Sequence, residues 1–424
     1  MGQAQQLSHV YPRGSRVDDR GRIEVGGCDT TELAREFGTP AYVVVEDDIR
    51  ARAHAFVSAF GAHTDAFDVI FASKAFPCTA VYRLLWEEGI GCDVAGPGEL
   101  TQALAAGVDP ARIYLHGNAK THAEMAQALA AGVGYVIVDN LRDLDLLEEL
   151  AGSRPGAAPQ AAFLRVAPGV SPDTHPAIST GGPNTKFGFD LAHAPAALER
   201  AAASPAIDLR GIHLHIGSQI LDTAPFRTAL EAVAPLAAGL PEINFGGGLG
   251  VAYGAHDEPP SIEAYVAAKV AAVRDLLGAD VRMVDEPGRA LVANSTVTLY
   301  EVQSVKRNVD TYVAVDGGMS DNLRPMLYNA RYEARISGRT GAGTRCHVVG
   351  KHCESGDILV RDAELADPQP GDILVTPGTG AYGHAMANTY NGALRPPVIF
   401  VSGGNARVVV RRETHADLLL RDVG

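Results

Sequence analysis

The chain has 424 residues, a formal net charge of −14, 46% hydrophobic residues and 20% charged residues. This acidic balance argues against nucleic acid and against an anionic membrane surface as partners, because both favour proteins with basic patches. The chain is too long for one small core, so we expect two domains, and its composition is ordinary for a globular enzyme.

The N-terminus and the cysteines favour a cytoplasmic protein. Residues 1–13 show no basic start followed by an apolar run, so we expect no secretory signal. No apolar stretch approaches the length of a membrane span. The five cysteines are scattered without a CxxC pair, which is typical of reduced thiols and not of a disulfide framework or a zinc site.

Short strands alternate with helices from residue 67 to residue 289. Apolar runs predict strands at 67–74, 91–96, 113–117, 134–140, 161–169, 211–217, 242–248 and 281–289. Ala- and Leu-rich segments such as 99–107, 122–132 and 261–278 predict helices between them. Eight repeats indicate an α/β fold, a (β/α)₈ barrel of the TIM type, with a doubly wound open sheet as the alternative.

Polar residues or glycines end nearly every predicted strand, and this favours the barrel. These ends are Lys74, Asp93, His116, Asp139, Arg165, His215, Gly246–Gly248 and Glu286. Barrel enzymes build their active sites from the C-terminal ends of the strands. We therefore expect an active site at the barrel mouth.

The pattern changes after residue 290. Short apolar runs at 296–307, 311–318, 345–350, 397–404 and 406–413 are separated by Gly, Pro and Asp, and predict a C-terminal β-rich domain of the sandwich or barrel type. A further strand signal at 21–27 indicates that the N-terminus joins this domain. The predicted domains are a barrel over 39–288 and a discontinuous β domain over 1–38 and 289–424.

Three strand ends together indicate a cofactor. Lys74 follows a buried run, so it either caps the strand in solvent or has a partner that compensates its burial. Gly246–Gly248 could cradle a phosphate or simply form a tight loop, and Glu286 could pair with Arg289 or face a heterocyclic nitrogen. A lysine for a Schiff base, a phosphate cradle and an acid for a pyridine nitrogen are what pyridoxal 5′-phosphate requires.

Two further groups have two interpretations each. His213 and His215 face the same side of one strand and could bind a metal, but the sequence offers no further ligand set, so we predict no metal; His215 could instead stack on a flat ring. Cys353 lies among acidic residues, which raise the pKa of a thiol, so it is either a general acid or part of a surface loop.

Ten motifs occur in the order of a known family: FASKAF, CDVAGPGEL, LHGNAK, KFGF, GIHLHIGSQI, NFGGGLG, EPGRA, DGGMSDNLRPMLY, CESGD and GTGAYG. Through them, almost the whole chain resembles the type III pyridoxal-phosphate decarboxylases of the alanine-racemase-like fold, and most closely the diaminopimelate decarboxylase family. The resemblance implies decarboxylation of meso-2,6-diaminopimelate to L-lysine and CO₂, the last step of lysine biosynthesis. A related decarboxylase of another amino acid, such as ornithine, arginine or a secondary-metabolite intermediate, is the alternative.

The resemblance also implies roles for single residues. Lys74 would hold the cofactor covalently, His215 would stack on its ring and Glu286 would hold its nitrogen. The phosphate would be bound by Ser218, Gly246, Gly247, Gly248, Gly288, Arg289 and Tyr382. The substrate would be bound by Arg289, Arg324, Tyr328, Tyr382 and Glu354. Cys353 would donate a proton after CO₂ leaves, reaching in with Glu354 from the partner subunit of a homodimer.

Two residue types favour this activity over its relatives. Glu286 keeps the ring cationic and so a strong electron sink, whereas alanine racemases of this fold are expected to have an arginine there. Arg289 and Arg324 suit a distal carboxylate, whereas an ornithine decarboxylase needs an acid for a terminal amine.

Overall fold

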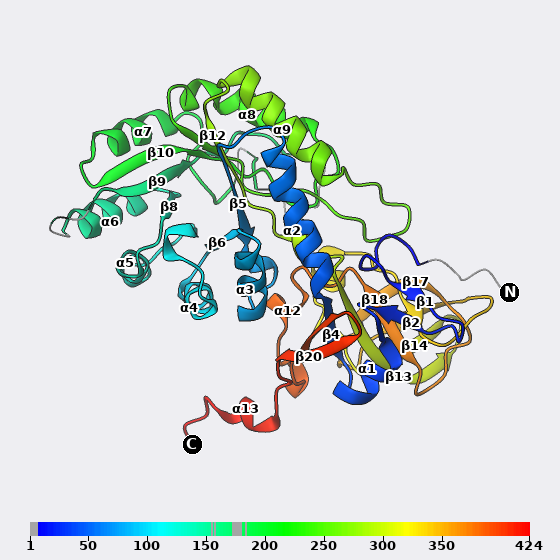
Figure 1. The fold of residues 1–424 in the computed structure, drawn as a ribbon. Coiled ribbons are helices and arrows are strands. Elements are labelled where there is room, and N and C mark those ends of the chain that lie inside the picture. The colour runs from blue at the N-terminus through cyan, green and yellow to red at the C-terminus, as the bar shows by residue number, and fades with distance from the viewer. Residues whose placement is uncertain (1–6, 154–155, 157, 172–179, 183–184) are drawn as a thin grey trace. The chain divides into compact units, whose positions relative to one another are not determined.

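The computed structural model describes residues 7–153, 156, 158–171, 180–182 and 185–424. The chain divides into two compact units. Figure 1 shows the fold with its residues coloured from the N-terminus to the C-terminus. Unit 1 consists of Met1–Ala51, Val251–Glu258 and Leu291–Gly424, and unit 2 of Arg52–Gly250 and Pro259–Ala290.

Unit 2 contains eight parallel strands. They are β5 (Phe67–Ala72), β6 (Gly91–Val94), β7 (Ile113–Leu115), β8 (Tyr135–Val138), β9 (Gln160–Arg165), β10 (Ile207–His213), β11 (Glu242–Asn244) and β12 (Arg282–Asp285). The pairing of β12 with β5 closes the strands into a barrel. The predicted (β/α)₈ barrel is therefore confirmed, and the open-sheet alternative is wrong.

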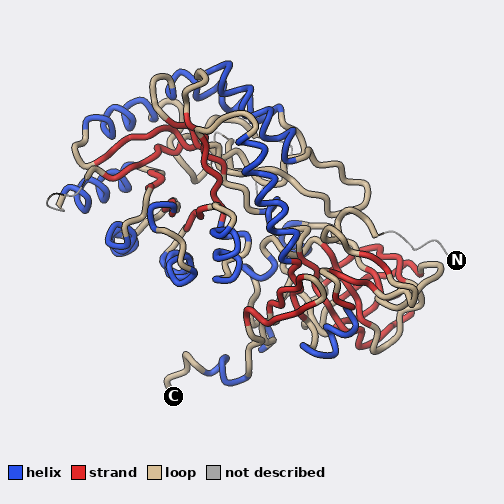
Figure 2. The backbone as a smooth tube through the Cα atoms, viewed as in Figure 1, coloured by secondary structure: helices blue, strands red, loops and turns tan. Residues whose placement is uncertain are grey.

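Helices cover the outside of the barrel strands (Figures 1 and 2). They are α3 (Thr79–Glu87), α4 (Pro97–Ala106), α5 (His122–Ala131), α6 (Leu141–Gly152), α7 (Ala194–Ala203), α8 (Ala224–Ala237) and α9 (Ile262–Leu276), and α2 (Glu46–Gly61) leads in from unit 1. Local sequence signals explain their ends. In α5, Thr121 and Glu124 form a capping box, and Gly132 ends the helix in a left-handed conformation that glycine adopts without strain.

The barrel has its own buried cluster. Ile70, Tyr114, Ile137, Phe163 and Val284 come from five different strands and are all buried. Bulky side chains on the strands of a small barrel fill its interior, so the barrel is packed and is not a pore. This packing leaves the C-terminal strand ends as the place where polar side chains can gather.

Unit 1 is built from strands. A three-stranded sheet contains β1 (Arg16–Val17), β2 (Ile23–Val25) and β3 (Cys28–Asp29). A nine-stranded sheet contains β4 (Ala41–Val45), β13 (Thr296–Arg307), β14 (Thr311–Val315), β15 (Arg335–Ile336), β16 (Thr344–Val349), β17 (Ile358–Leu365), β18 (Ile373–Pro377), β19 (Val398–Ser402) and β20 (Asn405–Val410). Its helices are α1 (Thr30–Phe37), α11 (Arg324–Tyr328), α12 (Gly383–Met386) and α13 (His415–Leu419), while α10 (Arg289–Val292) runs from unit 2 into unit 1. The predicted β-rich domain is thus confirmed.

Strand β4 lies in the sheet of unit 1, although the sequence analysis placed residues from 39 onward in the barrel. It pairs antiparallel with β13 and parallel with β19. All five residues of β4 are buried, as expected for a central strand that is covered on both faces. A continuous apolar run of this kind predicts a buried strand but does not say which sheet it joins.

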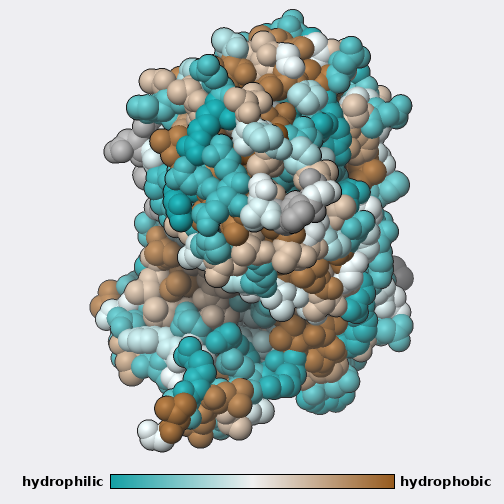
Figure 3. Space-filling model, turned by 90° about the vertical axis from the view of Figure 1, so that its left-hand side faces the viewer, coloured by the Kyte–Doolittle hydropathy of each residue, from teal (hydrophilic) through white to brown (hydrophobic). Residues whose placement is uncertain are grey.

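The surface is of mixed hydropathy. Figure 3 shows hydrophilic and hydrophobic residues interspersed over one face. Among the described residues, no helix has both the length and the apolar character that crossing a bilayer requires.

Candidate active site

Lys74 lies just beyond the end of β5. The strand ends at Ala72, and Ser73–Ala75 form a single 3₁₀ turn, so the prediction of a strand reaching Lys74 is wrong by two residues. The turn is held from the neighbouring strand β6, where Asp93 Oδ1 accepts a hydrogen bond from Ser73 N at 2.8 Å. The Lys74 side chain is exposed, so no burial penalty has to be compensated.

Asp93 itself is buried and close to charged groups. Burial raises the pKa of Asp93 to about 6, although the charges of His116 and Lys74 act in the opposite direction. Ala72, at the N-cap of the turn that carries Lys74, has no side chain that can accept a hydrogen bond. The Asp93 carboxylate accepts from the first amide of the turn instead. Asp93 therefore fixes where the lysine amine leaves the barrel wall.

Glu286 follows β12 and is held by three side chains from three other strand ends. Its Oε1 accepts from His116 Nε2 at 3.0 Å and from Asn244 Nδ2 at 2.8 Å, and its Oε2 lies 3.3 Å from His213 Nε2. Burial alone would raise the pKa of Glu286, but His116 and His213 hold this pKa well below its usual range. The buried carboxylate is consequently ionised and presents acceptor oxygens only.

His213, the last residue of β10, and His215, two residues beyond it, are neutral at neutral pH. Burial lowers the pKa of His213 to about 4 and, together with the charges of Lys74 and Arg165, lowers the pKa of His215 well below its ordinary value. In both rings Nδ1 is buried and has no hydrogen-bond partner among the described residues. His213 therefore donates to Glu286 from Nε2, and His215 presents a flat neutral ring.

Ligand atoms of His116, His213 and Glu286 lie within 4.8 Å of one another, close enough to share a metal ion. Of the pair considered in the sequence, His213 belongs to this cluster and His215 does not. The hydrogen bonds from both imidazoles to the carboxylate provide a different use for this cluster, namely a fixed negative charge.

The glycine loop after β11 passes close to both neighbouring strand ends. Gly246 has φ of 58°, and a Cβ there would lie 2.8 Å from His215 Nδ1. A Cβ at Gly247 would clash with the carbonyl oxygen of Glu286. Within the described part of the chain, the amides of Gly247 and Gly248 donate no hydrogen bond, so they are available to an anion.

Ser218 and Arg289 lie on either side of this loop, after β10 and before the body of α10. Arg289 is buried and donates to Ser218 Oγ from Nε at 3.2 Å and from Nη2 at 2.9 Å. Gly288 packs against β5, and a Cβ added at this position would lie 2.9 Å from Ala72 Cβ. Hydroxyl, guanidinium and loop amides thus come from three adjacent strands of the barrel.

Arg324, Tyr328 and Tyr382 belong to unit 1. Arg324 starts α11 and is buried, with its guanidinium 4.7 Å above the ring of Tyr253 and one Nη1 donating to the Tyr332 hydroxyl. Its Nε is buried without a partner in the described residues. Tyr328, at the other end of α11, is half-buried, as is Tyr382, which precedes α12 with φ of 68°.

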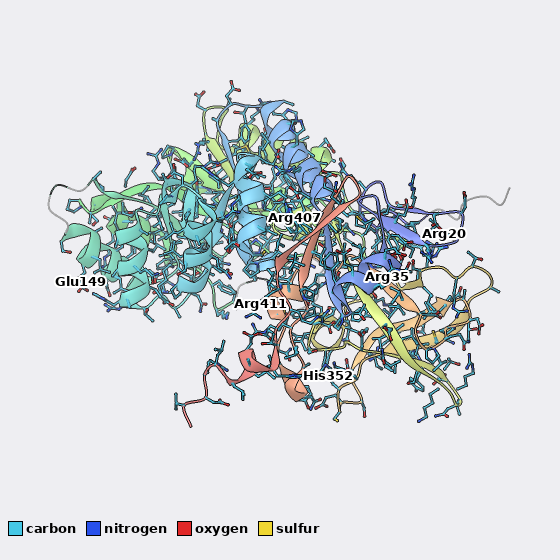
Figure 4. All side chains as sticks on the ribbon, turned by 60° about the horizontal axis from the view of Figure 1, so that its bottom comes forward. Arg20, Arg35, Glu149, His352, Arg407 and Arg411 are labelled. Atoms are coloured by element: carbon cyan, nitrogen blue, oxygen red, sulfur yellow. The ribbon has the colours of Figure 1, made fainter. Side chains whose placement is uncertain are left out.

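Cys353 and Glu354 lie in an exposed loop of unit 1. The loop is ordered from within, since Asp357 accepts from the amide of His352 at 3.0 Å and the Glu354 carboxylate accepts from the Tyr390 hydroxyl at 2.5 Å. Figure 4 labels His352 beside this loop. Both side chains therefore face solvent in the single chain, with a backbone that is fixed beneath them.

Sequence reasoning missed three residues of the site. Asp93 and His116 were recognised as polar strand ends without a role, and Asn244 was not singled out. The missing signal is register, because Asn244 pairs directly with His213 across β10 and β11. His213 and Asn244, the last residues of β10 and β11, therefore lie side by side and both reach Glu286.

Known proteins resemble this chain over nearly its whole length. Residues 46–293 match the family described as pyridoxal-dependent decarboxylase, pyridoxal binding domain. The chain is 43% identical to a diaminopimelate decarboxylase of Actinosynnema pretiosum subsp. auranticum, over 98% of this chain and 95% of the relative. It is 42% identical to that of Bacillus subtilis (strain 168), over 96% and 97%.

Solved structures of diaminopimelate decarboxylases also resemble this chain. The diaminopimelate decarboxylase of M. jannaschii in complex with L-lysine has a TM-score of 0.90 at 33% identity, covering 97% of this chain and 98% of that one. The enzyme of Helicobacter pylori complexed with L-lysine has a TM-score of 0.85 at 32% identity, covering 92% and 98%. A lysine/ornithine decarboxylase of Vibrio vulnificus, at 23% identity and a TM-score of 0.75, shares the fold.

Proposed function

Since this chain belongs to the diaminopimelate decarboxylases, a family of pyridoxal-dependent decarboxylases, we propose that its barrel mouth holds the cofactor while residues of unit 1 select the substrate. The cofactor is pyridoxal 5′-phosphate. The reaction converts meso-2,6-diaminopimelate to L-lysine and CO₂ and completes lysine biosynthesis. The assignment of single residues is the part that rests on geometry and chemistry.

The barrel mouth fits this cofactor. Gly246 leaves room that a Cβ would fill, and the amides of Gly247 and Gly248 suit a phosphate. Ser218 and Arg289 add a hydroxyl and a cation beside that loop. When bound, pyridoxal phosphate supplies an electron sink for the carbanion that decarboxylation leaves behind.

Glu286 is the observation that most favours decarboxylation. Its buried, ionised carboxylate holds the proton at the ring nitrogen, and this keeps the ring cationic. Lys74, on the turn fixed by Asp93, is the amine that holds the cofactor covalently. His215 offers a neutral face for stacking, which needs no counter-charge.

Arg324 and Tyr328 are proposed to bind the distal carboxylate of the substrate. The buried Nε of Arg324 lacks a partner in the described chain and is suited to a carboxylate oxygen. Tyr382 is proposed to lie between the phosphate and the substrate. These assignments separate diaminopimelate, which has a distal carboxylate, from amino acids such as ornithine, which have a terminal amine and no second carboxylate.

A homodimer is proposed to complete each site. Cys353, as a protonated thiol, would return a proton to the substrate's α-carbon, and Glu354 would meet the distal ammonium, both reaching the barrel of the other subunit. The support is that both side chains are exposed in a loop whose backbone is ordered. The five cysteines, all free thiols, support the cytoplasm as the compartment.

The test is to incubate the purified protein and pyridoxal phosphate with meso-diaminopimelate and, separately, with ornithine, and to identify products by mass spectrometry. We expect lysine from the first and no putrescine from the second. Borohydride reduction should leave the cofactor on the peptide that contains Lys74. If putrescine forms and lysine does not, the protein is an ornithine decarboxylase, and the proposed substrate is wrong while the proposed cofactor site still stands.

A further inference from the structure

Asn244 is the last residue of β11 and is completely buried. Its Nδ2 donates to Glu286 Oε1 at 2.8 Å, and its Oδ1 accepts from the amide of Gly246 at 2.8 Å. The orientation of the side-chain amide is determined by these partners, because an ionised carboxylate only accepts and a backbone N–H only donates. One side chain thus touches both the acid and the glycine loop.

The backbone closes the same connection. Glu286 N donates to the carbonyl oxygen of Gly246 at 2.9 Å, and Gly247 passes so close to Glu286 that only glycine fits. The acid and the loop therefore move as one body, and Asn244 is the side chain that sets their separation.

Asn244 also decides which oxygen of Glu286 faces outward. Oε1 already accepts two hydrogen bonds, from Asn244 and His116, which fill its two lone pairs. Oε2 has His213 alone and keeps one acceptor position. A donor that enters the barrel mouth consequently meets Oε2.

We propose that Asn244 is a positioning residue that fixes the carboxylate of Glu286 relative to the loop Gly246–Gly248, and so sets the span between the ring-nitrogen end and the phosphate end of the cofactor. The inference rests on the proposed function, which assigns Glu286 and the loop to those two ends. A rigid, flat cofactor has a fixed distance between its nitrogen and its phosphate, so a site that holds both ends needs this span to be fixed in advance.

Asn244→Asp tests this with little change of volume. The variant keeps an acceptor for the Gly246 amide but places an acceptor against Glu286. Titration of the apoprotein with pyridoxal phosphate, followed by fluorescence, should show a Kd raised about tenfold or more. The absorption spectrum of the bound cofactor, which reports on the ring, and its ³¹P resonance, which reports on the phosphate, should both shift.

The matched control is Asn140→Asp, at the N-cap of α6, where aspartate also accepts the capping hydrogen bond from Asp143 N. It adds the same charge to the barrel and should leave Kd and both spectra unchanged. Asn244→Ser, which can accept from Gly246 but is too short to reach Glu286, is the second variant if Asn244→Asp does not fold. Circular dichroism should show that Asn140→Asp and the Asn244 variant that is used are both folded.

A double-mutant cycle separates coupling from a general loss of stability. Glu286→Gln supplies an amide that can donate to the carboxylate of the Asn244→Asp variant, so the double variant should bind the cofactor more tightly than the two single losses predict. Additive losses, or a shift at one end of the cofactor only, would overturn the proposal. These readouts need no substrate, so they stand apart from a failure to decarboxylate diaminopimelate.

Discussion

Arg289 donates from both Nε and Nη2 to the hydroxyl of Ser218, at 3.2 and 2.9 Å. The two residues come from the strand ends on either side of β11, so they flank the glycine loop Gly246–Gly248. The sequence analysis gave Arg289 two roles, one at the phosphate and one at the substrate carboxylate. Its pairing with Ser218 favours the phosphate role.

Ser218→Ala and Arg289→Lys are therefore expected to weaken cofactor binding. Ser218→Ala should raise the Kd for pyridoxal phosphate about tenfold, since one hydrogen bond to a charged group is lost. Arg289→Lys should cost more, because an ammonium cannot reproduce the planar fork of a guanidinium. At saturating cofactor, the KM for diaminopimelate should stay near the wild-type value. If the KM for diaminopimelate rises while the affinity for the cofactor is unchanged, Arg289 binds the substrate and not the phosphate.

The stability of the apoprotein should fall as the pH drops below about 6.5, and His213 should be one cause. Its pKa is about 4 in the folded chain, below the ordinary value of 6.5, so the unfolded chain binds more protons between these values. The contribution of His213 to the free energy of unfolding is therefore fully present above the pKa of the unfolded chain and is lost as the pH falls toward the pKa of the folded chain. For this residue we expect a loss of about 2 kcal/mol between about pH 7.5 and about pH 5.

His213→Gln provides the comparison. Glutamine can still donate to Glu286 but does not titrate, so its free energy of unfolding should depend less on pH by this amount. Urea unfolding of both proteins at the two pH values measures the difference directly. Equal slopes for wild type and variant would mean that His213 takes up its proton in the folded state as readily as in the unfolded chain.

Much of this architecture could be predicted from local patterns. The barrel strands are apolar runs that end in polar residues, and each was found within a few residues of its true position. Strand β4 was not predicted as a strand, and its residues were assigned to the barrel domain, because burial on both faces looks the same in a barrel and in a central sheet strand. Pairing partners are a property of the whole fold and are absent from a five-residue run.

The residues of the site likewise divide into those that the sequence could predict and those that it could not. Lys74, Glu286 and the glycines could be found because a cofactor demands those residue types near strand ends. Asn244 and Asp93 could not, because their importance lies in which neighbour their side chains reach across the barrel. A buried amide that links two functional groups has the same local sequence signal as any polar residue at the end of a strand.

Arg324 is expected to control the choice of substrate. Arg324→Ala should raise the KM for diaminopimelate about 10- to 100-fold, with kcat less affected, because a charge-assisted pair to the distal carboxylate is lost. Arg324→Lys should recover little, since lysine cannot stack on Tyr253 and present a fork at the same time. Tyr332→Phe, which removes only the hydroxyl that Arg324 contacts, is the control and should change KM far less. Steady-state kinetics at saturating cofactor gives all four values.

The proposed sharing of sites between subunits predicts complementation. Lys74→Ala and Cys353→Ala should each be nearly inactive, yet a mixture of the two that is allowed to exchange subunits should regain activity. In a hybrid dimer one site receives both altered residues and the other receives neither, so a statistical mixture, half of it hybrid, should approach a quarter of the wild-type rate. Native mass spectrometry shows whether hybrids have formed. If hybrids form and activity stays absent, Lys74 and Cys353 act within one chain, and the exposed loop around Cys353 must reach the barrel of its own subunit.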